Sequence, residues 1–221
     1  MYPPITVMAL GILAILVVAL FVIIEIGMIQ AAYERLGISH RTVSLLLLLM
    51  IFGSYVNLPI ATVSVSQIVH DQVITFWGIP YVVPHVAIAG HTEIAINLGG
   101  ALIPLFTCVY VLTRTGAYLK SAIAIAIVSL VVNRFSTIVP GVGIAIPTLI
   151  PGVLAAVVAT LLERRRAPAM AFVAGTLGCL IGADLMNLPH IAQMRAPIAS
   201  IGGAGTFDGV FVSGLIAVLL A

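Results

Sequence analysis

The chain has 221 residues, of which 62% are hydrophobic and 7% are charged, and its formal net charge is +2. A soluble domain of this size does not hide so many apolar side chains in one core, so we expect the chain to lie in a membrane. The charge is too small to indicate a nucleic-acid partner. Because backbone groups in lipid must be satisfied internally, the Val- and Ile-rich runs are expected to be helices and not strands.

Apolar runs separated by charged residues, prolines and glycines predict membrane-spanning helices. The predicted ranges are 5–30, 42–63, 94–113, 119–137, 142–162, 168–188 and 199–221. Each has about the 20 residues that span the hydrocarbon of a bilayer. The first run is too long for a signal peptide and is expected to stay in the protein. We therefore predict an all-α, seven-span bundle that forms one membrane domain over residues 1–221.

Basic residues mark one side of this topology. If the N-terminus is outside, the inner connections contain Arg35, Arg41, Arg114, Lys120 and Arg164 to Arg166, and only Arg134 and Arg195 lie on the outer side. Cytoplasmic connections of membrane proteins carry an excess of lysine and arginine. The pattern therefore predicts an outer N-terminus and an inner C-terminus.

Two short motifs occur twice and in the same order. Asn-Leu-Pro begins at Asn57 and again at Asn187, and Gly-Gly-Ala begins at Gly99 and again at Gly202. They predict a parallel repeat with halves 1–113 and 142–221, joined by the span 119–137. Short matches also arise by chance in so apolar a sequence, so a repeat and a coincidence remain equally open.

Two acidic residues lie in the predicted outer half of the membrane, where ionisable groups are functional candidates. Asp184 is near the end of the sixth span, with Asn187 three residues later, and Asp208 is in the seventh span. The pair Gly205 and Gly209 encloses Asp208 at a spacing that allows close helix packing. Two adjacent carboxyl groups would share a proton, so one becomes an acid and the other a base.

This pairing favours peptide hydrolysis with Asp184 and Asp208 as the catalytic groups, but other hypotheses use the same residues. Both could instead be helix-end groups that are wetted by the outer aqueous phase and hydrogen-bonded to Asn187, Thr206 or a Gly-rich backbone. In a transporter, the two acids with Asn187 and Asn97 would bind a proton or cation, and the solute would be a small molecule or an ion. An accessory membrane subunit, whose partner is unknown, would need none of these activities.

A metal site is the weakest of the hypotheses. His91, Glu93 and His190 are predicted on the outer side and carry ligand atoms that zinc accepts. However, His91 and Glu93 do not have the spacing of ligands on a helix. We therefore predict no metal and no cofactor.

Several segments are similar to a prokaryotic family of uncharacterised membrane proteins. The similarity covers most of the chain and is carried by the runs 97–104, 140–144, 181–188 and 200–211. It implies a polytopic fold in a prokaryotic plasma membrane and does not supply a substrate.

The two aspartates also loosely resemble those of the intramembrane aspartyl proteases with a Gly-x-Gly-Asp motif. That family places one aspartate on each of two adjacent transmembrane helices, which implies a transmembrane peptide substrate. This chain differs from the pattern because its second acid lies in the run Gly205-Thr206-Phe207-Asp208. No tyrosine precedes Asp184 directly, and no Pro-Ala-Leu motif occurs.

Overall fold

The computed structural model describes residues 4–64, 72–76, 79–83, 91–141, 143–194, 196–203 and 209–221. Its α-helices are α1 (Pro4–Arg35), α2 (His40–Gly53), α3 (Ile103–Thr115), α4 (Tyr118–Phe135), α5 (Leu149–Leu162), α6 (Ala167–Cys179) and α7 (Gly209–Leu220). Two π-helical segments, η1 (Leu98–Leu102) and η3 (Leu180–Asp184), and two 3-10 segments, η2 (Arg164–Arg166) and η4 (Leu185–Met194), extend or connect them. The strands are β1 (Asn57–Ser64), β2 (Gln72–Phe76), β3 (Ile79–Val83), β4 (His91–Asn97), β5 (Thr137–Val139), β6 (Gly143–Ala145) and β7 (Ile198–Ile201).

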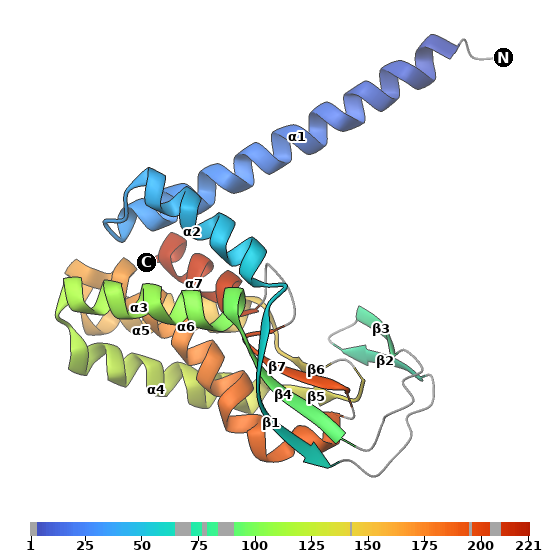
Figure 1. The fold of residues 1–221 in the computed structure, drawn as a ribbon. Helices are drawn as coiled ribbons and strands as arrows, with labels where there is room; N and C mark the ends of the chain where they lie inside the picture. The colour runs from blue at the N-terminus through green and yellow to red at the C-terminus, as the bar shows by residue number, and fades with distance from the viewer. Residues whose placement is uncertain are drawn as a thin grey trace.

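Helix α6 is the centre of a helical bundle. It contacts α3, α4, α5 and α7, and nearly all of its residues are buried. Glycines let the neighbouring helices approach closely: a Cβ atom at Gly175 would lie 2.9 Å from the Ser213 carbonyl oxygen of α7. Helix α1 instead extends away from the bundle (Figure 1). The predicted helical bundle is therefore present, with α6 as its core.

A small mixed sheet lies beyond one end of this bundle (Figure 1). Strand β4 is its central strand, antiparallel to β1 and parallel to β7. Asn57 of β1 stands opposite Asn97 of β4, and Ile96 of β4 stands opposite Ile201 of β7. Two hairpins, β2–β3 and β5–β6, are separate from this sheet.

The exclusion of strands is wrong, and the predicted span 42–63 gives the first correction. Helix α2 ends at Gly53, whose backbone packs against Gly99, and the Ser54 hydroxyl then bonds to the Ile51 carbonyl at 2.7 Å. Residues 57–64 pair with β4 as an extended strand. Their β-branched side chains suit a strand as well as a lipid-facing helix, so hydrophobicity alone did not separate the two.

Three further predicted spans also begin with strand residues. Span 94–113 begins inside β4, span 142–162 includes β6, and span 199–221 begins in β7. Helix α5 starts only at Leu149, after Pro147, because proline disfavours helical geometry in the residue that precedes it. The all-α prediction therefore describes the bundle and fails for the sheet end of the molecule.

Four helical segments in the described residues are long and apolar enough to cross a membrane. They are Leu10–Arg35, Leu98–Thr115, Tyr118–Phe135 and Arg164–Met194, and three shorter helices, α2, α5 and α7, are also apolar. Large apolar side chains face outward from the bundle, including Phe106, Leu119 and Leu161, which are 68%, 76% and 81% exposed. Such a surface is typical of contact with lipid or with another protein.

The basic residues at the other end of the bundle tie helix ends together. Arg35 donates to the Val218 carbonyl of α7 at 3.2 Å, and Arg166 donates to the Thr115 carbonyl at the end of α3. Lys120 binds the exposed Glu163 carboxylate, with 2.8 Å between the nitrogen and oxygen atoms. The hydrogen bond from Lys120, together with its charge, holds the pKa of Glu163 below its usual value.

Candidate functional site

Asp184 lies where the helical bundle meets the sheet. It ends the π-helical segment η3, which continues α6, and its side chain is half-buried. One carboxylate oxygen, Oδ2, accepts a hydrogen bond from the Gly202 backbone N–H at 2.7 Å. Gly202 directly follows β7 and has φ of 85°, a conformation that favours glycine. This hydrogen bond thus connects the end of β7 to the carboxyl group of Asp184.

Asn97 organises a second set of polar contacts at the same junction. It is fully buried at the end of β4, and its amide nitrogen donates to the Ser54 carbonyl at 2.8 Å and to Asn57 Oδ1 at 3.0 Å. Its own Oδ1 accepts from the Gly100 N–H at 2.7 Å, at the start of η1. Asn97 therefore connects the end of α2, strand β1 and the start of the α3 segment.

Ser200 carries this network across the sheet to β7. Its hydroxyl lies 2.7 Å from Asn57 Oδ1 and 2.9 Å from the Gly203 carbonyl oxygen, and its single proton can be donated to either. Asn57 Oδ1 thus faces donors from both β4 and β7. The contacts join the three strands by side chains as well as by their backbone.

The two Gly-Gly motifs meet at this junction. A Cβ atom on Gly100 would overlap the carbonyl oxygen of Gly202, and one on Gly202 would lie 2.6 Å from Ala101 Cβ. Only glycine allows the backbones to come so near. Through this contact the Asn97 network lies directly beside the loop that holds Asp184.

A small cavity adjoins Asp184. It has a volume of about 20 Å³ and is lined by the polar residues Asp184 and Ser200 and by apolar side chains that include Ile144, Leu188 and Ile191. Its size suits about one water molecule, which needs polar partners such as these two. The arrangement can thus hold a water or a small cation against a carboxyl group, and it is too small for a peptide.

The other predicted site residues have separate positions. The Asn187 amide donates to Ser136 Oγ at 2.9 Å and to the Ala183 carbonyl at 2.8 Å, so it fastens η4 to the end of α4. Gly209 begins α7, and a Cβ atom there would lie 3.9 Å from Cys179 Sγ. Gly205, Thr206 and Asp208 lie outside the described residues, as does the predicted Asp184–Asp208 pairing.

The weak metal candidates do not form a cluster. His91 and Glu93 lie on β4, and His190 lies on η4. Within the described ranges, no group of three or more His, Cys, Asp or Glu side chains could hold a metal ion.

Sequence reasoning missed the roles of Asn57 and Ser200. Asn57 begins the first Asn-Leu-Pro motif, which was interpreted only as part of a repeat, and Ser200 lies two residues before the second Gly-Gly-Ala motif. The repeated motifs were the sequence signal that could have identified these residues. The structure adds a second signal, because π-helical segments are frequent at functional sites, and one such segment follows Asn97 while the other ends at Asp184.

A comparison with protein families identifies the family of this chain. A family model described as a protein of unknown function, DUF1614, matches residues 51–220. This chain belongs to the DUF1614 family. The matched range contains the sheet, the bundle from α3 to α7, and the junction around Asp184 and Asn97, whereas α1 lies outside it. The predicted similarity to an uncharacterised family is confirmed, and the match supplies no protease relationship.

No curated protein and no solved structure gives a match to this DUF1614 chain. The geometry of the junction is therefore what indicates its function.

Proposed function

We propose that this chain is a multi-pass membrane protein in which Asp184 binds a proton or a small cation during transport. Membrane insertion is supported by the apolar helices and by their outward-facing side chains. The helix ends joined by Arg35, Lys120 and Arg166 form the inner side, and the sheet lies toward the outer side. The N-terminus is then outside and the C-terminus inside.

The observation that carries this proposal is the half-buried carboxyl group of Asp184 beside a cavity of about 20 Å³. A carboxylate at membrane depth is costly, and binding a proton or cation neutralises it. Ion sites of transporters commonly lie where helices are interrupted and backbone groups become accessible. Here η3, which ends at Asp184, interrupts the regular helix, and the Gly202 N–H donates a hydrogen bond to the carboxylate.

The cavity size favours an ion or a proton over a larger solute. A cation of similar size can replace the single water that fits this cavity, with Asp184 as its charged ligand and Ser200 as a neutral ligand. Transport then requires the junction to open toward each side in turn, and the glycine contacts between η1 and the β7 loop are where two backbones can separate.

The test is ion-coupled flux in proteoliposomes. The purified chain is reconstituted with an internal pH-sensitive dye, and a sodium gradient is imposed. Asp184→Asn is expected to reduce the dye signal at least tenfold, because the amide can neither release a proton nor attract a cation. Glu93→Gln, which removes an acid from β4, is the matched control and should retain flux. Flux in Asp184→Asn at the wild-type rate would refute the proposal.

Intramembrane proteolysis is a second proposal, favoured by one contact. Gly209, the residue after Asp208, lies near Cys179, five residues before Asp184. This places the start of α7 against the end of α6, as a shared site for two aspartates requires. A water held beside Asp184 would then be the nucleophile, with one carboxyl as base and the other as acid.

Cleavage of a transmembrane reporter peptide separates the two proposals. If the dyad is catalytic, Asp184→Asn and Asp208→Asn each reduce cleavage more than a hundredfold, because both carboxyl groups take part in proton transfer. Folded protein is checked by size-exclusion chromatography. If cleavage persists in either variant, Asp184 and Asp208 are not a catalytic pair. The flux experiment still tests separately whether Asp184 binds a transported proton or cation.

A further inference from the structure

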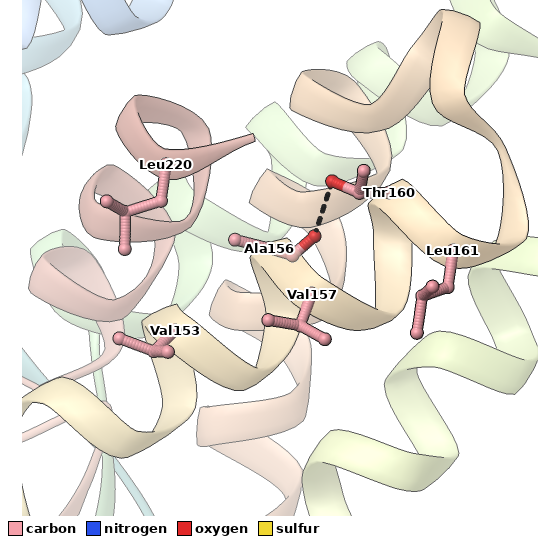
Figure 2. A pocket seen from close by; sticks show the side chains of 6 residues that line it. All are labelled: Val153, Ala156, Val157, Thr160, Leu161 and Leu220. Atoms are coloured by element: carbon pink, nitrogen blue, oxygen red, sulfur yellow. Dashed lines mark hydrogen bonds between the residues drawn. The ribbon is translucent and has the colours of Figure 1, made fainter.

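An apolar groove runs along the outer face of α5 toward the basic end of the bundle. It has a volume of about 320 Å³ and is lined by Val153, Ala156, Val157, Thr160 and Leu161 of α5 and by Leu220 of α7. Figure 2 shows Val153, Val157 and Leu161 along α5, with Leu220 across from them on α7. The spacing of four residues places the first three on one helical face.

The groove offers no polar group to a ligand. Its hydroxyl, from Thr160, donates to the Ala156 carbonyl at 2.8 Å (Figure 2). Leu161 and Leu220 are 81% and 60% exposed and form the rim. The groove therefore fits a flexible hydrocarbon chain better than a polar solute.

Two exposed arginines follow the last groove residue of α5 along the chain. Arg164 follows Leu161 by three residues, a stretch that spans at most about 11 Å. Arg164 and Arg165 are exposed, and their guanidinium groups form no hydrogen bond or ion pair within the described part of the chain. The neighbouring charges are occupied, because Arg166 binds the Thr115 carbonyl and Glu163 binds Lys120.

We infer that the groove binds one anionic phospholipid. An acyl chain lies along Val153, Val157 and Leu161, and the phosphate headgroup binds Arg164 and Arg165. Arginine forks match phosphate oxygens, and basic sites at the inner end of transmembrane helices are where anionic headgroups are recognised. The site is distinct from Asp184, which lies at the opposite end of the bundle, so the inference does not depend on the transport proposal.

The experiment measures lipid binding to the full chain in detergent micelles by native mass spectrometry. Phosphatidylglycerol is the probe, and phosphatidylcholine with the same acyl chains is the neutral comparison. Arg164→Gln with Arg165→Gln is expected to weaken phosphatidylglycerol binding about 25-fold, at about fivefold for each arginine near an anionic headgroup. Arg134→Gln, at the other end of α4, is the control for lost charge and should bind normally.

Two further arms test the groove itself. Val157→Trp fills the outward-facing groove without touching the arginines, and it should weaken binding by at least fivefold. Glycerol phosphate, which has the headgroup charge and no acyl chain, should not compete. Equal binding of the two lipids, normal binding in the double arginine variant, or competition by glycerol phosphate would each overturn the inference.

Discussion

Gly100→Ala is expected to destabilise the fold by about 3 kcal/mol or more, the upper end of the cost of overpacking. The new methyl group would overlap the Gly202 carbonyl oxygen, which is backbone and cannot rotate away as a side chain does. The clash separates η1 from the β7 loop and disturbs the hydrogen bond between Gly202 and Asp184. Reversible unfolding in mixed detergent micelles measures the change in unfolding free energy.

Gly27→Ala is the matched control for this substitution. Gly27 lies in α1, and a Cβ atom there would meet nothing within 4 Å. The same exchange should therefore be neutral or stabilise the helix by up to about 1 kcal/mol. If Gly100→Ala were as stable as Gly27→Ala, the close backbone contact at the junction would be wrong.

Asn97→Ala should cost about 3 kcal/mol, because it removes three hydrogen bonds and leaves the Gly100 N–H and the Ser54 carbonyl buried without their partner. Asn133→Ala provides the comparison. Asn133 is half-buried, and within the described residues its side chain makes one hydrogen bond, to the Gly182 carbonyl at 3.1 Å, so its loss should cost about 1 kcal/mol. The same unfolding assay ranks the two variants.

A double-mutant cycle tests whether the network is connected. Asn97 and Ser200 both contact Asn57 Oδ1, so Asn97→Ala and Ser200→Ala should couple by at least about 0.5 kcal/mol. Additive effects, or an Asn97→Ala cost no greater than that of Asn133→Ala, would contradict the proposed organisation of the junction.

The long helices could be predicted from the sequence because their apolar runs have clear ends. The span predicted at 119–137 matches α4 at Tyr118–Phe135, where Lys120 and Arg134 mark the two ends. Each of the other predicted spans also overlaps a helix. Their number as true membrane crossings, their orientation and the internal repeat stay predictions.

The sheet could not be predicted, because its pairings join distant segments. Strand β4 pairs with β7 about a hundred residues later, and in an apolar sequence nothing local indicates this partner. The two Gly-Gly motifs, which suggested a repeat, are instead seen in contact with each other. The contact between the two Gly-Gly motifs does not decide between a true repeat and a chance match, because it is compatible with both.

The candidate site was predicted in part. Asp184 and Asn97 stood out as polar groups within apolar runs, and both lie at the junction. A Gly-rich backbone was one of the partners considered for the aspartates, and Asp184 accepts a hydrogen bond from the Gly202 N–H, but residue types alone could not indicate which backbone N–H it would be. The role of Asn187 beside Asp184 remains a prediction, and its observed contacts go to Ser136 and to Ala183 of η3.

The short helices α5 and α7 have a consequence for the surrounding lipid. Their 14 and 12 residues correspond to about 21 and 18 Å, against about 30 Å of hydrocarbon. In the proposed orientation, the bilayer beside this face has to become thinner to match them. Headgroups and water are then drawn inward on the side of the sheet, and the path from the aqueous phase to Asp184 becomes correspondingly shorter.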